Sequence, residues 1–203
     1  MTILIKNGRV INPSENLDKV MDVYVEDGII KEKAEKIEKQ ADQVIDAVGC
    51  YVMPGLIDLH VHFRDPGLTY KEDIETGSKA AAKGGFTTVC CMPNTKPVVD
   101  NVETVKYIIE KGEKTGLTNV LPVGAVTKNM AGVEITDVEE LKKAGICAIS
   151  EDGKSVMNSG VYRKAMKNAA KANVPVLAHC EDINLVEGGV INLGDKSSEL
   201  GVK

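Results

Sequence analysis

Residues 55–67 read GLIDLHVHFRDPG, an apolar run that leads into His60 and His62 and then into a Pro-Gly turn. The chain has three histidines in all, and two of them lie here, one residue apart. Alternate side chains of a β-strand share a face, so His60 and His62 are expected to point the same way at a strand end. Two such imidazoles can converge on one metal ion. Because an isolated His-x-His pair is more often two hydrogen-bonded surface histidines, the other strand ends are needed to decide.

From Leu56 onward the sequence alternates between strand-like and helix-like segments. Comparable points on the strands lie roughly 25–35 residues apart, which is the repeat of βα units in a parallel sheet. The expected strands are 56–63, 86–92, 119–126, 146–150 and 174–178. The expected helices are 71–83, ended by Gly84-Gly85; 102–114, begun by a capping box of Asp100 and Glu103; a segment capped by Thr136 and Glu139 that ends at Lys143; and 160–171.

Five parallel strands fit either an open doubly wound sheet or part of a (β/α)₈ barrel. No glycine-rich phosphate loop follows any of the strands. Polar residues instead follow their carboxyl ends, which is where a barrel assembles its active site, and this favours the barrel. These residues are His60, His62, Asn94, Asp152 and His179.

The first 53 residues are expected to form a separate small β module. Asn7-Gly8 and Asp27-Gly28 are both typical of two-residue hairpin turns between short strands. Pro54-Gly55 then separates this region from the alternating strands and helices that follow it. The sequence therefore predicts two parts, residues 1–53 and residues 54–203.

Composition limits the classes of function. Thirty acidic and 25 basic residues give a net charge of −5, without a basic patch that would favour nucleic acid or a membrane surface. We see neither a signal peptide nor an apolar run long enough to span a membrane. The five cysteines form no C-x-x-C pair, and four lie in or beside apolar runs. A cytoplasmic location is expected.

The remaining strand ends strengthen the metal hypothesis. Asp152 follows the fourth strand, and His179 follows the fifth after a clean apolar run. Taken alone, Asp152-Gly153 would be a turn and His179 an ordinary polar residue. Together with His60 and His62 they supply nitrogen and oxygen ligands suited to zinc or a similar divalent ion. The two oxygens of Asp152 would also allow it to bridge two ions.

Four segments carry a resemblance to a known family. The stretches PGLIDLHVHFRDPG, CMPNTKP, SEDGKSV and AHCED resemble the amidohydrolase superfamily and, within it, the bacterial dihydroorotases with a bridging aspartate. The resemblance covers the whole chain. It implies an α/β fold, with the N-terminal part of a metal-dependent (β/α)₈ barrel preceded by a small β-sandwich portion.

The resemblance also implies roles for individual residues. His60 and His62 would bind the more buried of one or two zinc ions, Asp152 would bridge, and His179 would bind the second ion. His62, Arg64 and Asn94 would bind the substrate, the last two through its carboxylate. The general-base aspartate of the family is expected beyond Lys203, so no catalytic residue is expected within this chain. Four other polar residues are expected to be structural: Asp58, Lys154, Glu181 and Asp182.

The activity implied is zinc-dependent, reversible cyclisation of N-carbamoyl-L-aspartate to (S)-dihydroorotate in de novo pyrimidine biosynthesis. A barrel needs about 250 residues, and 150 follow Met53. We therefore expect an N-terminal portion that is inactive alone. Two alternatives stay open: a hydantoinase or allantoinase, whose bridge is typically a lysine, and a non-catalytic scaffold that supports aspartate transcarbamoylase. Self-association and a transcarbamoylase partner are undecided by the sequence.

Overall fold

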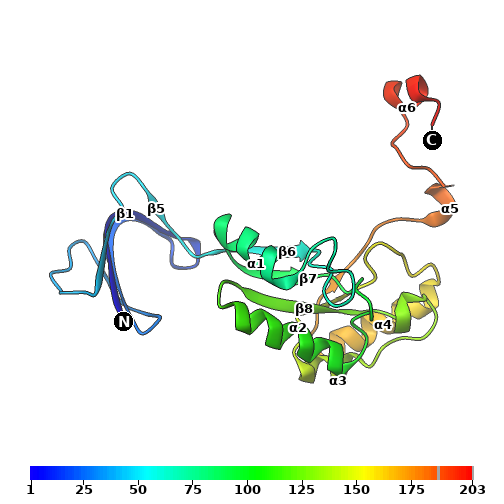
Figure 1. Ribbon diagram of the computed structural model, residues 1–203, viewed down its shortest axis with the longest axis horizontal. Helices are drawn as coiled ribbons and strands as arrows, with labels where there is room; N and C mark the ends of the chain where they lie inside the picture. The colour runs from blue at the N-terminus through cyan, green and yellow to red at the C-terminus, as the bar shows by residue number, and fades with distance from the viewer. Residues whose placement is uncertain (187, 203) are drawn as a thin grey trace. The chain divides into compact units, whose positions relative to one another are not determined.

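The computed structural model describes residues 1–186 and 188–202. It divides into two compact units, Met1–Gly55 and Leu56–Lys203, and each unit has its own sheet (Figure 1). The sequence predicted this boundary two residues earlier, after Met53. Among the described residues, no helix has the length and apolar composition needed to cross a membrane.

The first unit is a five-stranded sheet built around β1. On one side β2 pairs with β1 and β3 with β2, both antiparallel, whereas β4 and β5 pair in parallel with β1 on its other side. Leu4, Tyr24 and Ile37 form a small core on this sheet. The strands are β1 (Thr2–Asn12), β2 (Leu17–Glu26), β3 (Ile29–Ala34), β4 (Gln43–Asp46) and β5 (Tyr51–Val52), with one 3₁₀ turn, η1 (Pro13–Glu15), between β1 and β2.

One of the two hairpins predicted for this unit is confirmed. Asp27 and Gly28 join β2 to β3, and Glu26 pairs directly with Ile29. Both turn residues have positive φ, 50° and 76°, as a type I′ turn requires.

The hairpin predicted at Asn7-Gly8 is wrong. The chain continues through both residues within β1, and only the pairing register with β2 shifts there. Asn7 has a φ of 61°, and its N–H donates to the buried carboxylate of Asp22 at 2.9 Å. A Cβ atom at Gly8 would lie 2.4 Å from Val52. The Asn-Gly pair therefore forms a β-bulge that a distant carboxylate and β5 hold in place.

The second unit contains five parallel strands whose order in the sheet is their order in the chain, β6 to β10. Figure 1 shows β6, β7 and β8 side by side; along the chain, α1 connects β6 to β7 and α2 connects β7 to β8. The strands are β6 (Leu56–Val61), β7 (Phe86–Cys91), β8 (Asn119–Ala125), β9 (Ala148–Ser150) and β10 (Val176–Leu177). The helices are α1 (Ile74–Lys83), α2 (Val102–Thr115), α3 (Val138–Ala144), α4 (Ser159–Lys171), α5 (Ile183–Val186) and α6 (Asp195–Leu200), with a 3₁₀ turn, η2 (Lys128–Met130), after β8.

The main core lies between one face of this sheet and the helices α1 to α4. Each of these helices contributes buried or half-buried apolar side chains to it, and so does each strand. The opposite face carries a smaller cluster that, in the described residues, contains no helix residue: Cys90, Met92, Val123 and Ala148, with Leu121, Cys147 and Leu177 packed against them. A doubly wound sheet has helices on both faces. The unit is therefore an α/β fold with a parallel half-barrel sheet.

Two of the predicted helix caps are off by one residue. The helix α2 begins after Asn101, whose side chain accepts the N–H of Thr104, and not with a capping box from Asp100. The helix α3 begins after Asp137, which accepts the N–H of Glu140, and not after Thr136. In both cases neighbouring residues are of types that can cap a helix, so local chemistry alone did not select the position.

Candidate metal centre

The parallel strands bring the polar residues that follow them to one edge of the sheet. His60 lies within β6, and His62 follows its last residue directly. Asp152 and His179 each lie two residues beyond the end of their strands, β9 and β10. Asn94 follows β7 by three residues. The five side chains predicted at this edge from the sequence are therefore supplied by four strand ends.

Asp152 stands at the centre of the group. Its Oδ1 atom lies 3.2 Å from Nε2 of His60 and 3.3 Å from Nδ1 of His179, and its Oδ2 atom lies 3.3 Å from Nε2 of His62. The aspartate side chain is only 8% exposed, whereas that of His60 is 52% exposed. One buried carboxylate thus contacts all three histidines of the chain.

The donor set fits a divalent metal ion. His60, His62 and Asp152 offer ligand atoms that all lie within 4.8 Å of one another. Two ligands of one zinc ion are separated by up to about 4 Å, because each bond is about 2.0–2.2 Å long. Small side-chain movements would therefore suffice to bring the three atoms to one ion. His179 contacts the same carboxylate, but its role as a ligand, like those of the others, stays a prediction.

Asn94 determines which nitrogen of His62 carries the proton. Its Nδ2 lies 3.1 Å from the Asp152 carboxylate, and its Oδ1 lies 3.3 Å from Nη1 of Arg64. Arginine can only donate and a carboxylate can only accept, so the amide orientation is fixed. Nδ1 of His62, 3.0 Å from that same Oδ1, must therefore donate. In the neutral ring, Nε2 of His62 would then carry the lone pair that a metal ligand requires.

The electrostatic surroundings of His62 favour its neutral form. Burial lowers the pKa of His62 below its ordinary value of 6.5, and the nearby Arg64 adds to this effect, whereas the hydrogen bond to Asn94 and the charge of Asp152 oppose it. A neutral imidazole is the form that binds metal. Burial thus favours the form of His62 that a metal ion would bind.

Arg64 and Asn94, the two residues predicted to bind a substrate carboxylate, are neighbours. The Arg64 backbone has a φ of 58°, an uncommon value for a residue with a side chain. Its guanidinium donates to Asn94 Oδ1 at 3.3 Å. The structure brings the pair together beside His62, and their role in binding a substrate stays a prediction.

The model of the dihydro-orotase-like family matches residues 49–202. The chain belongs to this family. The match includes all five strand-end residues described above.

Individual relatives of this dihydroorotase-like chain agree with the family. Curated proteins named dihydroorotase from Ruminiclostridium cellulolyticum and Aquifex aeolicus are 51% and 50% identical to it along its whole length. The chain spans 47% and 48% of them, about half the length of the curated relatives it matches. A solved structure of a D-hydantoinase (dihydropyrimidinase) from Thermus sp. is 30% identical, with a TM-score of 0.71 over 98% of this chain and 43% of that one.

Four polar residues near the site were expected to be structural, and all four make local contacts. Asp58 accepts the N–H of His60 at 2.9 Å. Lys154 donates to the Met130 carbonyl at 3.2 Å, and Asp182 accepts the N–H of Asn184 at 2.9 Å. The carboxylate of Glu181 lies 3.7 Å from Nε2 of His179.

Two buried carboxylates beside the site had no place in the sequence-based interpretation. Glu151, next to Asp152, accepts the backbone N–H of Thr127 at 3.0 Å and is also bonded to its hydroxyl. This contact ties the end of β9 to the end of β8. Asp65, next to Arg64, is buried as well. Its Asp-Pro-Gly setting is typical of a turn, and no local signal shows that two of its partners lie on α2.

Proposed function

We propose that the chain forms the N-terminal portion of a dihydroorotase. The activity is the zinc-dependent, reversible cyclisation of N-carbamoyl-L-aspartate to (S)-dihydroorotate in de novo pyrimidine biosynthesis. The observation that carries the proposal is the contact of the Asp152 carboxylate with His60, His62 and His179. The chain that makes this contact is 51% and 50% identical to curated proteins named dihydroorotase.

The metal roles follow from the donor atoms. Nε2 of His60 and Nε2 of His62 would hold one zinc ion together with Asp152. A second ion would lie beside His179 and share the aspartate, whose Oδ1 contacts both His60 and His179. Bound zinc lowers the pKa of water toward neutrality and polarises a carbonyl group, which is the chemistry that opening a cyclic amide needs.

Arg64 and Asn94 would hold the carboxylate of the substrate. A guanidinium presents a planar fork that can bind a carboxylate through two hydrogen bonds. Asn94 Oδ1 now occupies part of that fork, and the incoming carboxylate would replace it. Asn94 also contacts Asp152. A substrate held by Arg64 and Asn94 would therefore have its reacting carbonyl beside the metal ligands, and His62 would contact the substrate.

The fold supports the same proposal. Five parallel strands in chain order, with the helices α1 to α4 packed on one face, are what the first strands of a (β/α)₈ barrel would form. The sheet of the first unit would be part of the small β-sandwich, with the domain boundary near residue 53. A cytoplasmic location, association between copies of the protein and a transcarbamoylase partner also belong to this proposal.

A hydantoinase is the second candidate, because a D-hydantoinase shares the fold at 30% identity. Two features favour dihydroorotase. The identity to proteins of that name is 51%, and the bridging position holds Asp152 and not a lysine. A non-catalytic scaffold is disfavoured because all four metal ligands expected in this stretch are present.

The test uses the full-length protein, with the whole length of the curated relatives, loaded with zinc. Ring opening of dihydroorotate is measured beside that of hydantoin and allantoin. We expect turnover of dihydroorotate and at most weak turnover of the other two, and Asp152→Ala should lose zinc and activity together. Preferential hydrolysis of hydantoin would overturn the assignment, and zinc-loaded protein without any activity would favour the scaffold.

A further inference from the structure

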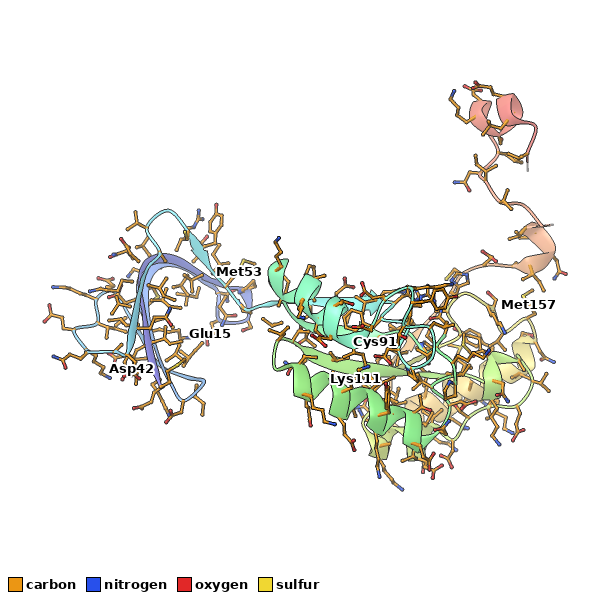
Figure 2. The ribbon with its side chains drawn as sticks, in the orientation of Figure 1. Glu15, Asp42, Met53, Cys91, Lys111 and Met157 are labelled. Carbon is orange, nitrogen blue, oxygen red and sulfur yellow. The ribbon has the colours of Figure 1, made fainter. Side chains whose placement is uncertain are left out.

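Asp65 is an acidic side chain that the proposed reaction does not use, and it is completely buried. Its side chain is 0% exposed. Oδ2 lies 2.6 Å from Nζ of Lys111 and accepts the N–H of Ile74 at 3.3 Å, while Oδ1 accepts the hydroxyl of Tyr107 at 2.9 Å. Both Tyr107 and Lys111 belong to α2, where Figure 2 labels Lys111. The carboxylate thus fastens the loop after β6 to two helices.

The buried carboxylate of Asp65 has the partners that it needs. Burying a carboxylate is costly unless it is paired and hydrogen-bonded, and three donors satisfy this one. The hydrogen bond to Asp65 raises the pKa of Lys111 above its ordinary value, with a smaller contribution from the Tyr107 hydroxyl. Lys111 therefore stays charged at neutral pH. At 38% exposure its side chain is still partly in solvent.

The same loop is also joined to the loop that carries Asn94. The carbonyl of Pro66 accepts the N–H of Lys96 at 3.0 Å. Gly67 packs so closely that a Cβ atom there would lie 1.8 Å from the Lys96 carbonyl oxygen. The segment 65–67 is therefore held from α2 on one side and from the Asn94 loop on the other.

Arg64 lies directly before this anchored segment. Its left-handed backbone, with a φ of 58°, is a conformation that persists only where the surroundings impose it. In the described residues the only side-chain hydrogen bond of Arg64 is the one to Asn94 at 3.3 Å. Its backbone carbonyl accepts the N–H of Leu68 at 2.9 Å, so the conformation of Arg64 depends on the anchored segment that follows it.

We propose that Asp65, Tyr107 and Lys111 form a positioning unit that holds Arg64 in this conformation, with its guanidinium beside Asn94 and ready for a carboxylate. The inference rests on the proposed function, because it assigns these three residues to substrate binding. None of them touches the substrate. Removing Lys111 leaves the buried carboxylate short of its charged partner, so the loop relaxes and the guanidinium moves away from its place.

The test compares full-length Lys111→Met with wild type and with Lys106→Met. Lys106 is exposed on the same helix and makes no ion pair among the described residues. We expect Lys111→Met to raise KM for dihydroorotate about tenfold or more, since a small misplacement of a binding group has effects of this size. The zinc content should stay at the wild-type level and kcat should change less than KM. Lys106→Met should leave all three unchanged.

Two further variants separate positioning from general stabilisation. In an Arg64→Met background, Lys111→Met should raise KM no further, because the group that it positions is gone. Lys111→Arg keeps the charge and should restore most of the wild-type KM. If Lys111→Met does not fold, Tyr107→Phe removes one hydrogen bond from the same carboxylate and should raise KM about threefold, the effect of one modest hydrogen bond.

The outcomes distinguish the two proposals. A wild-type protein that binds zinc but does not open dihydroorotate contradicts the proposed function. An active wild type whose Lys111→Met variant loses thermal stability but keeps its KM contradicts the positioning role. An equal rise in KM in the presence and absence of Arg64 contradicts it too.

Discussion

The side-chain amide of Asn94 donates hydrogen bonds to two oxygens of Asp152. Nδ2 of Asn94 lies 3.1 Å from the carboxylate Oδ2 of Asp152 and 3.3 Å from its backbone carbonyl. The other end of the same amide contacts His62 and Arg64. Asn94 therefore connects the candidate metal ligands with the candidate substrate-binding residue.

This connection predicts that Asn94→Ala weakens zinc binding as well as substrate binding. Residues that orient metal ligands typically change metal affinity by about 10–100-fold when they are removed. We expect a loss in zinc affinity of about tenfold in the full-length protein, measured by competition with a chelator. Asn119→Ala is the matched control, because Asn119 is the first residue of the neighbouring strand β8 and lies at the sheet edge opposite the site. Unchanged zinc affinity in Asn94→Ala would show that its contact with Asp152 has no role in the metal site.

Arg64→Met is expected to affect the substrate alone. A guanidinium that binds a carboxylate is not a metal ligand, so KM for dihydroorotate should rise strongly while the zinc content stays constant. Arg64→Lys should recover only part of the affinity, because an ammonium group lacks the planar fork. Steady-state kinetics with parallel metal analysis checks both statements. Normal kinetics of Arg64→Met would remove this residue from the substrate site.

The lowered pKa of His62 predicts a pH dependence for the metal-free protein. Burial makes the folded protein bind a proton at His62 more weakly than the unfolded chain, whose pKa is near 6.5. As the pH falls below about 6.5, the unfolded chain takes up the proton first, so the free energy of unfolding decreases until the folded pKa is passed. His62→Gln should make this decrease shallower. Urea unfolding between about pH 7.5 and about pH 5.5 measures both slopes, and equal slopes would contradict the assignment to His62.

Gly67 and Gly85 form a matched pair for testing the loop contact. Their φ values are 87° and 82°, but a Cβ atom at Gly85 meets nothing within 4 Å. Gly85→Ala should therefore cost only the left-handed backbone term, about 1–2 kcal/mol. Gly67→Ala should lose a further 1–3 kcal/mol, roughly the cost of overpacking against Lys96. Equal free energies of unfolding for the two variants would show that the loop around Lys96 moves to accommodate the added methyl group at little energetic cost.

The strands and helices were predictable where the signal is local. Apolar runs marked all five parallel strands, and Gly84-Gly85 marked the end of α1. The Asp27-Gly28 hairpin was also evident, since the two flanking strands pair with each other. The same reasoning failed at Asn7-Gly8, because the pairing of β1 with β5 and the contact with Asp22 come from residues far away in the chain.

The convergence of the site followed from the sheet, since parallel strands place their carboxyl ends together. Its supporting residues did not follow. The sequence pattern around Asp65 predicts a turn residue, and its partner Tyr107 lies 42 residues further along the chain. Which helix face meets a loop depends on the packing of α2 against the sheet, and this packing has no signature in the FRDPG segment itself.

Anomalous diffraction at the zinc edge, from crystals of the full-length protein loaded with zinc, tests the central claim most directly. We expect a peak about 2.0–2.2 Å from Nε2 of His60, from Nε2 of His62 and from an oxygen of Asp152. A second ion, where present, should lie between Asp152 and His179. A zinc ion bound by other residues, with the Asp152 carboxylate not coordinated, would contradict the metal centre and the function derived from it.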